Sequence, residues 1–476
     1  MSVDWSWRQL EPEEGRFEFE PLRQAIRQAA RQGDGIELHI KGSVWELRHF
    51  PSEANYPGNW KAHIESSATA PRWLAKYDIP LIEERKRGLD NIGTPFQVVN
   101  MDIYHPEYHT RYMRMLRAFG ESGIPQMDEI SVCMIHVMSG SRGEEGAGPE
   151  SGAGAQAFEE RLRAWAKAFQ GAEHKLCYVA NKGKHLELCY ELGIGQRNGF
   201  VEHYLMHYQN PQLGQSLDED GYLVVDEDCP PIAGNWAFGD ENEEYSPGVH
   251  ENRFGPIESW PHRYRESMLR ALQMRRNLLW AESPPWVNIP LLNYVGLELG
   301  KNARTAPDAW CYLRESLAGQ AGKPPVPIKN FERWLYQRDK PGFRAAPAAK
   351  VFVPSKMLVF HPDHYYDYTA RTTSQAEGET RIGFALDDRF LSGGPSRVAI
   401  KVTYHDIGQA RWALEMRGAG GELERAVQCG ATGKIRTATF IVEDAMFANP
   451  GMDFDFVIRA DEGDAVVSFV RVIKLP

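Results

Sequence analysis

The sequence predicts an α/β fold, a (β/α)8-type TIM barrel, followed by an antiparallel β-sandwich domain. Strand-like and helix-like segments alternate up to about residue 320, a pattern typical of parallel strands joined by helices. Neither GxGxxG nor GxxxxGK[ST] follows the first strand, which favours a barrel over a doubly wound nucleotide-binding sheet. After about residue 345, short alternating segments end in Gly, Asp and Asn turns, as expected for a sandwich.

The predicted domains are a catalytic barrel at residues 1–322, a connector at 323–345 and the accessory sandwich at 346–476. The connector has Pro and Gly at its flanks and carries Phe331, Trp334 and Leu335 at helical spacing. It lacks a long Gly/Ser tract, so we expect it to dock on the barrel rather than to act as a mobile tether.

The barrel elements begin with the helix FEPLRQAIRQAARQG, which places Leu22 and Ile26 on one face and ends at Gly33. The strand IELHIK follows at once. Further predicted strands are DEISVCMIHV, KLCYVAN, GFVEHYL, PIAGNWAFG and NLLWAE, separated by helical segments. If SVDW is the second strand of the barrel, no residues of this sequence precede it to form the first strand. The barrel is therefore expected in one of two forms, complete or lacking its first strand.

Composition excludes several classes of partner. The chain has 476 residues, 42% of them hydrophobic and 25% charged, and a formal net charge of −11. This charge argues against nucleic acid and anionic membranes, and no apolar run approaches the roughly 20 residues of a membrane span. The expected location is cytoplasmic as the chain is written, and periplasmic or secreted if an N-terminal signal has been truncated.

The cysteines do not indicate a metal site. Six are present, without CxxC or Cys/His spacing, which favours buried free thiols. No HExxH motif or clustered His/Asp spacing occurs, so neither a metal nor another cofactor is expected. The oligomeric state is left open.

Two glutamates follow predicted strands. Glu144, with its neighbour Glu145, lies in a glycine-rich loop after the strand at about 130–137, and Glu241 follows the strand that ends near Phe238. Glycosidic hydrolysis needs one protonated and one ionised carboxyl group across the sugar. Acidic residues at strand ends also serve as helix caps or solvated charges, so this alternative stays open.

The segment WSWRQLEPEEGRFEFEPLRQAIRQAARQG resembles the early strand, loop and helix of clan A glycoside hydrolases, barrel enzymes that include β-galactosidase-like and β-agarase-like families. The segment SGSRGEEG is similar to their acid/base segment on the fourth strand. The resemblance covers about residues 1–320. It implies that Glu144 is the general acid/base and that Glu241, at the end of the seventh strand, is the nucleophile.

The resemblance implies an enzyme that cleaves β-glycosidic bonds, galactosidic ones among them, of plant or algal oligo- or polysaccharides by a retaining mechanism. One departure is Gly143, because many clan members have an Asn directly before the acid/base that binds the sugar 2-hydroxyl. That contact must come from elsewhere or is missing.

Aromatic and polar residues near predicted strand ends are candidates for substrate binding. Aromatic rings stack on sugars, while His, Tyr and Asn bind hydroxyls or orient the nucleophile. Each of them can equally belong to the core. The candidates are Trp5, Trp7, His39, Trp45, Asn181, His203, Tyr204, Trp236 and Trp280.

Two other functions remain open. A non-catalytic carbohydrate-binding protein on a barrel scaffold would keep the tryptophans without needing both carboxylates. A polysaccharide lyase would use a Tyr/His base and a neutralised uronate, and would release an unsaturated product.

Overall fold

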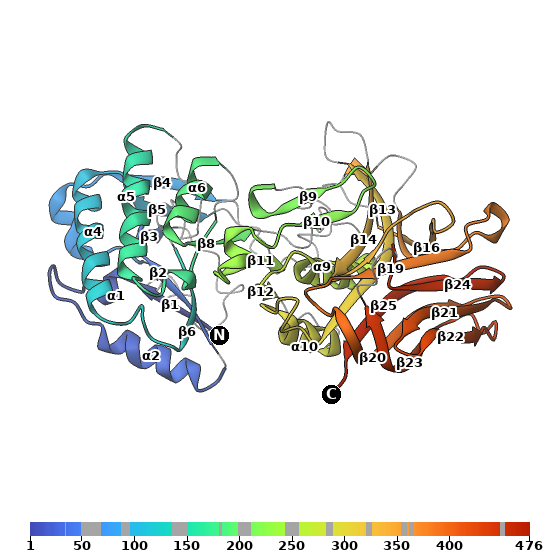
Figure 1. The fold of residues 1–476 in the computed structure, drawn as a ribbon. Helices are drawn as coiled ribbons and strands as arrows, with labels where there is room; N and C mark the ends of the chain where they lie inside the picture. Colours follow the sequence, from blue (N-terminus) through green and yellow to red (C-terminus); the bar gives the residue numbers. More distant parts are fainter. Residues whose placement is uncertain are drawn as a thin grey trace. The chain divides into compact units, whose positions relative to one another are not determined.

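The computed structural model describes the chain except residues 34, 49–67, 87–95, 136–150, 180–182, 199–210, 243–256, 282–288, 320–325, 354–358, 361–365 and 448–452. The chain divides into two compact units. The first comprises Met1–Phe200, Glu227–His250 and Asn277–Ala281, and the second comprises Val201–Asp226, Glu251–Arg276 and Glu282–Pro476. Each unit therefore combines three separate stretches of sequence (Figure 1).

A parallel seven-stranded sheet organises the first unit as a half-barrel. Its strands in spatial order are β1 (Ser2–Ser6), β2 (Ile36–Lys41), β6 (Ile130–Met134), β7 (Leu176–Tyr178), β8 (Gly195–Asn198), β11 (Phe238–Asn242) and β12 (Leu278–Ala281). Every neighbouring pair is parallel. A separate antiparallel sheet has the order β3 (Val44–Arg48), β5 (Phe96–Met101) and β4 (Leu81–Lys86).

Helices connect these strands. In chain order they are α1 (Trp7–Leu10), α2 (Glu20–Ala30), the 3-10 helix η1 (Arg72–Tyr77), α4 (Pro106–Glu121), α5 (Gly152–Ala168), η3 (Glu173–Lys175), α6 (Gly183–Leu192) and α7 (Pro230–Ala233). Leu22 and Ile26 of α2 are fully buried, as the helical spacing predicts. They join Leu116 of α4 and Trp165 of α5 in one hydrophobic core.

The two faces of the parallel sheet differ because side chains alternate along each strand. On β2, Ile36, Leu38 and Ile40 belong to the core that contains the residues of α2, α4 and α5. Glu37 and His39 lie on the opposite face, which curves inward. This second face is called the concave face below.

The predicted (β/α)8 barrel is wrong. In the described part of the chain the parallel sheet has seven strands and stays open, with β1 and β12 as its edges. In a closed barrel every strand has two neighbouring strands. After β12 the chain continues into helix α10 (Ile289–Glu298) and then into β13 (Asp308–Gly319), which pairs in the antiparallel sheet and not with β12. The parallel pairing of the first strands is thus correct, but their closure is not.

A 13-stranded antiparallel sheet dominates the second unit and curls into a nearly closed barrel. The sheet consists of β13 and all the strands that follow it in the chain. These are β14 (Val326–Arg333), β15 (Leu335–Gln337), β16 (Ala346–Phe352), β17 (Val359–Phe360), β18 (Tyr366–Thr372), β19 (Arg381–Leu386), β20 (Gly393–Asp406), β21 (Arg411–Gly418), β22 (Gly421–Gln428), β23 (Lys434–Phe447), β24 (Phe456–Glu462) and β25 (Val466–Lys474). The remaining elements are η5 (Pro211–Leu213), β9 (Gln215–Leu217), β10 (Leu223–Val225), η6 (Ile257–Ser259), α9 (Trp260–Gln273) and η7 (Gln375–Glu377).

The predicted sandwich also needs correction. The C-terminal strands are antiparallel as expected, but they belong to one curled sheet that already includes β13, rather than to two stacked sheets. Residues 326–337, expected to form a connector helix, form β14 and β15 of this sheet. Phe331, Trp334 and Leu335 are fully buried there. The domain boundaries at 322 and 345 stay predictions.

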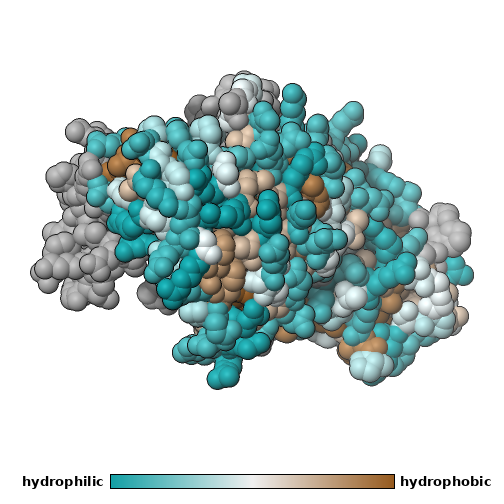
Figure 2. All heavy atoms as spheres, turned by 90° about the vertical axis from the view of Figure 1, so that its left-hand side faces the viewer, coloured by the Kyte–Doolittle hydropathy of each residue, from teal (hydrophilic) through white to brown (hydrophobic). Residues whose placement is uncertain are grey.

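The surface seen from the side of α4 is mostly hydrophilic, with small apolar areas (Figure 2). Helices that pack one apolar stripe inward expose polar faces in this way. Among the helices in the described ranges, none combines the length and the apolar character that a bilayer crossing requires.

Candidate functional site

The concave face of the half-barrel gathers chemically active side chains at the C-terminal ends of its strands. Paired residues of parallel strands lie on the same face, so the strand register identifies its members. His39 pairs with Met134 of β6, Arg197 of β8 pairs with Gly239 of β11, and Glu241 pairs with Trp280 of β12. Active sites on parallel α/β sheets lie at the carboxyl ends of the strands.

Three of these side chains contact one another. The imidazole of His39 stacks on the indole of Trp280, with ring centroids 5.5 Å apart and an interplanar angle of 11°. The guanidinium carbon of Arg197 lies 5.1 Å from the centroid of the Trp280 ring. His39 is buried, whereas Arg197 and Trp280 are half-buried. We call these three residues the stacked triad.

Ion pairs flank the stacked triad on the first two strands. Nε2 of His39 lies 3.4 Å from Oε1 of Glu37, and Nζ of Lys41 lies 2.6 Å from Oδ1 of Asp4. Glu37 is only 8% exposed, so its charge acts in a medium that screens it weakly. The triad therefore sits between these charged groups and a small apolar cluster of the same face, which includes Met134 and Leu278.

The structure places the predicted catalytic residues differently. Glu241 lies within β11 and is in register with Trp280 of the stacked triad. Glu144 lies outside the described residues, as do Asn181, His203 and Tyr204. The chain enters the segment that carries Glu144 soon after β6 ends at Met134.

The other tryptophan candidates lie away from the stacked triad. Trp7 is fully buried in the core, and Trp5, paired with Ile40, packs against that core from β1. Trp45, on β3, carries the guanidinium of Arg72 4.5 Å from its ring centroid. Trp236 precedes β11 and makes an edge contact with Tyr190 at 6.2 Å.

The LEP segment after β1 forms a structural clamp. Glu11 is completely buried and accepts hydrogen bonds from Nε1 of Trp7 at 2.8 Å and from the backbone N–H of Gly15 at 2.7 Å. Arg114 of α4 pairs with the same carboxylate, and Nε1 of Trp73 donates to the Glu11 carbonyl at 2.9 Å. The motif that carried the family resemblance thus joins β1, η1 and α4.

Glu14 extends this clamp. Its carboxylate pairs with Lys76 and accepts a hydrogen bond of 2.6 Å from the Tyr77 hydroxyl, while Nη1 of Arg114 lies 3.3 Å away. The hydrogen bonds from Lys76 and Tyr77 lower the pKa of Glu14 to about 2. The clamp therefore depends on an ionised carboxylate.

A cluster in the second unit has metal-ligand residue types. His262 and Glu266 of α9 and Asp367 of β18 hold ligand atoms within 4.8 Å of one another. Arg314 of β13 already binds both carboxylates, with Nε 3.0 Å from Glu266 and Nη2 2.8 Å from Asp367. Since a guanidinium fills the position of a cation, we interpret the cluster as a buried ion-pair network.

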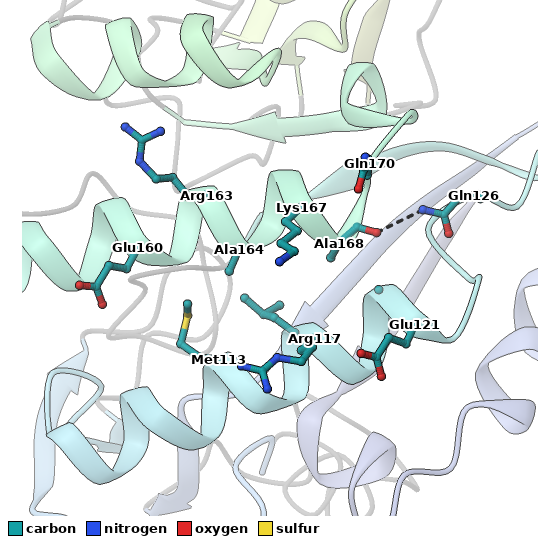
Figure 3. A pocket seen from close by; sticks show the side chains of 12 residues that line it. Met113, Arg117, Glu121, Gln126, Glu160, Arg163, Ala164, Lys167, Ala168 and Gln170 are labelled. Carbon is teal, nitrogen blue, oxygen red and sulfur yellow. Dashed lines mark hydrogen bonds between the residues drawn. The ribbon is translucent and has the colours of Figure 1, made fainter.

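A groove of about 940 Å³ lies between α4 and α5 in the first unit (Figure 3). Its lining includes Leu116, Ala164 and Ala168, together with charged side chains such as Arg117 and Lys167. Nε2 of Gln126 donates to the Ala168 carbonyl at 3.2 Å at one end. The groove lies between the covering helices and shares no residue with the stacked triad.

Sequence reasoning missed Glu37 and Arg197. The alternation of side chains along the strand IELHIK puts Glu37 on the same face as His39, so the sequence alone was enough to predict Glu37 as a neighbour of His39. Arg197 lies on the short strand β8, whose sequence GQRN lacks the β-branched and aromatic residues that mark a strand. Its place on the concave face depends on pairing with β11.

The comparisons with known proteins identify no family. No protein-family model and no curated protein matches the chain. A β-glucuronidase of Bacteroides uniformis is 10% identical over 99% of this chain and 65% of its own, with a TM-score of 0.24. The PRD1 vertex protein P5 is 8% identical over 36% of this chain and 98% of its own, with a TM-score of 0.17.

A third structure, the Eiger TNF of S. frugiperda, is 14% identical over 36% of this chain and 94% of its own, with a TM-score of 0.14. The chain spans just under two thirds of the glucuronidase, at 65% of its length. TM-scores this low do not define a shared fold. The clan A resemblance therefore stays a prediction.

The Glu14 clamp predicts a specific acid sensitivity. A carboxyl group with a lowered folded-state pKa stabilises the fold above its unfolded pKa of about 4.3, and this contribution disappears as the pH falls towards its folded pKa of about 2. Glu14→Gln should therefore destabilise the protein at pH 6 and make little difference near pH 2. Urea unfolding of both proteins across this range measures the difference.

Glu13→Gln is the matched control, because Glu13 is mostly exposed and pairs at 3.2 Å with an exposed arginine, Arg16. It should change stability little at any pH. An effect of Glu14→Gln that is equal at pH 6 and pH 3 would contradict the clamp.

The ion-pair network predicts a large cost for removing Arg314. Arg314→Met leaves Glu266 and Asp367 buried without their cation, which should lower the free energy of unfolding by about 3–5 kcal/mol. Adding Glu266→Gln should recover part of the loss because it removes one uncompensated charge. Urea unfolding followed by tryptophan fluorescence measures both variants. Thermal stabilisation of the unaltered protein by Zn²⁺ or Ca²⁺ would instead support a metal site.

Proposed function

We propose that the chain is a glycoside hydrolase whose active site is the concave face of the half-barrel, with Glu241 as its nucleophile. The observation that supports the proposal is the backbone register of Glu241, near the C-terminal end of β11, with Trp280 of the stacked triad. In parallel α/β enzymes, catalytic carboxylates come from this end of the strands.

The surrounding side chains suit the charges of glycosidic cleavage. The nucleophile must be ionised to attack the anomeric carbon, and a nearby cation such as Arg197 favours the ionised form. The indole of Trp280 offers an apolar surface to a sugar ring where the imidazole of His39 does not cover it. His39, oriented by Glu37, offers a ring N–H for a hydroxyl group.

The second carboxyl group is proposed to be Glu144. Parallel strands end at the same edge of a sheet, and the segment after β6 starts from the edge at which β11 ends. A loop from there supplies a general acid that protonates the leaving oxygen and later activates water. Glu145 is the nearest substitute in the same segment.

The proposed substrates are β-glycosides of plant or algal oligo- or polysaccharides, galactosides among them, cleaved with retention of configuration. In a retaining reaction the glycosyl group forms an ester with the nucleophile before water releases it. The two carboxyl groups must then lie about 5–5.5 Å apart.

The test is hydrolysis of a panel of aryl β-glycosides and polysaccharides, with the first product anomer identified by NMR. Glu241→Gln should reduce kcat by at least about a thousandfold, because the amide cannot form the glycosyl ester. Glu20→Gln, on the outer helix α2, is the control and should retain activity.

Other outcomes distinguish the alternative functions. Sugar binding by the unaltered protein without turnover of any glycoside would indicate a non-catalytic binding protein. A product that absorbs ultraviolet light through a new double bond would indicate a lyase. Full activity of Glu241→Gln would exclude Glu241 as the nucleophile.

A further inference from the structure

We infer that Arg197 and Trp280 form a subsite for the carboxylate of an acidic sugar, so that the concave face prefers uronic acid residues to neutral ones. The inference rests on the proposed function, because it names the substrate class of the same site. The inference depends on the position of the Arg197 guanidinium, on the groups around it and on the hydrogen bonds that its N–H groups can donate.

The guanidinium of Arg197 lies close to the proposed point of reaction. Its carbon is 5.1 Å from the ring centroid of Trp280, the residue in register with Glu241. Arg197 itself pairs with Gly239, two residues before Glu241 on the same strand. A sugar whose anomeric carbon faces Glu241 therefore has its ring substituents within reach of this positive charge.

Gly239, the residue in register with Arg197, lies against Leu278 of the neighbouring strand. A Cβ atom at this position would lie 2.7 Å from the carbonyl oxygen of Leu278 and 2.8 Å from its Cβ, closer than real Cβ atoms approach. Only glycine fits between β11 and β12 here, because Leu278 occupies the space that a side chain would need.

Two acidic groups of the neighbouring strands, Asp4 and Glu37, lie beside basic side chains. Asp4 is paired with Lys41 at 2.6 Å, and Glu37 lies 3.4 Å from His39. These pairs are made within β1 and β2, so they do not draw on Arg197. On the described part of this face, the guanidinium of Arg197 adds a positive charge beside Trp280 to these two pairs.

The chemistry of the guanidinium selects a carboxylate. Its planar fork of five N–H donors binds a carboxylate through two parallel hydrogen bonds and can keep a protein partner as well. The aromatic ring beside it restricts the orientation of the fork, which favours one bound geometry. A neutral hydroxymethyl group in the same position forms weaker bonds and gains no charge attraction.

The experiment measures binding apart from turnover. Calorimetry with the Glu241→Gln protein compares glucuronic or galacturonic acid oligosaccharides with their neutral glucose or galactose counterparts at low salt. The acidic sugars should bind at least about tenfold more tightly, as expected for a hydrogen bond to a charged group. The preference should shrink as salt is added.

Variants assign the preference to Arg197. In the Glu241→Gln protein, Arg197→Gln should reduce the preference for acidic over neutral sugars to within about twofold. Arg197→Lys should keep part of this preference because the positive charge remains. Arg111→Gln is the matched control: it removes a guanidinium that lies over the ring of Tyr77 on the other side of the unit. Its preference for acidic sugars should be unchanged.

The outcomes separate the two proposals. Equal binding of acidic and neutral sugars, or an acidic preference that survives in Arg197→Gln, would overturn the inference. If Arg197→Gln does not fold, a reduced preference in folded Arg197→Lys supports the inference, and full retention in Arg197→Lys with Arg111→Gln unchanged opposes it. An acidic preference without hydrolysis of any glycoside by the unaltered protein would retain the subsite and remove the proposed hydrolase activity.

Discussion

The curvature of the parallel sheet is the constraint on which the candidate site depends. In the strand order, β2 and β12 are separated by β6, β7, β8 and β11. Five strand spacings of about 4.8 Å would place them about 24 Å apart in a flat sheet. The rings of His39 and Trp280 are nevertheless 5.5 Å apart. Two side chains cannot bridge such a distance, so the sheet must curl until its early and late strands face each other.

The loop after β1 holds this curved sheet against its helices. Glu11 and Glu14 gather Trp7, Trp73 and Arg114 around two carboxylates, which joins the end of β1 to η1 and α4. A buried carboxylate is stable only when hydrogen bonds and cations compensate its desolvation, and Glu11 meets both conditions. The segment most similar to a known family therefore contributes to folding, and chemistry is left to the opposite face.

Local patterns predicted much of the first unit. The spacing of Leu22 and Ile26 gave the buried face of α2, and the apolar segments around Ile130–Met134 and Leu278–Ala281 form strands as expected. The openness of the sheet was not predictable in this way. Whether an edge strand acquires a neighbour depends on distant segments, and periodicity carries no information about them.

The second unit shows the same limit. The sequence around β13 fits a barrel strand locally, but β13 pairs with β25, about 160 residues later, and joins an antiparallel sheet. Arg314, Glu266 and Asp367 come from three elements, and only the fold brings them together. Such pairings follow from tertiary packing rather than from local propensity.

Position along the strands decides which of the predicted site residues lie close together. His39 and Trp280 were chosen because they follow or end predicted strands, and the structure brings them into contact. Trp7 was also chosen for its place near a predicted strand end, but its indole N–H binds Glu11 in the core. Arg197 was not predicted, because the sequence GQRN of β8 lacks the residue types typical of strands. Its guanidinium nevertheless lies over Trp280.

Trapping of a covalent intermediate tests the central claim most directly. A 2-deoxy-2-fluoro aryl β-glycoside with a good leaving group slows the release of the glycosyl ester, so the ester accumulates on a retaining nucleophile. Mass spectrometry of the digested protein should then find one adduct, on the peptide that contains Glu241. An adduct on another carboxylate, such as Glu37, or hydrolysis of β-glycosides without any adduct on Glu241, would contradict the account.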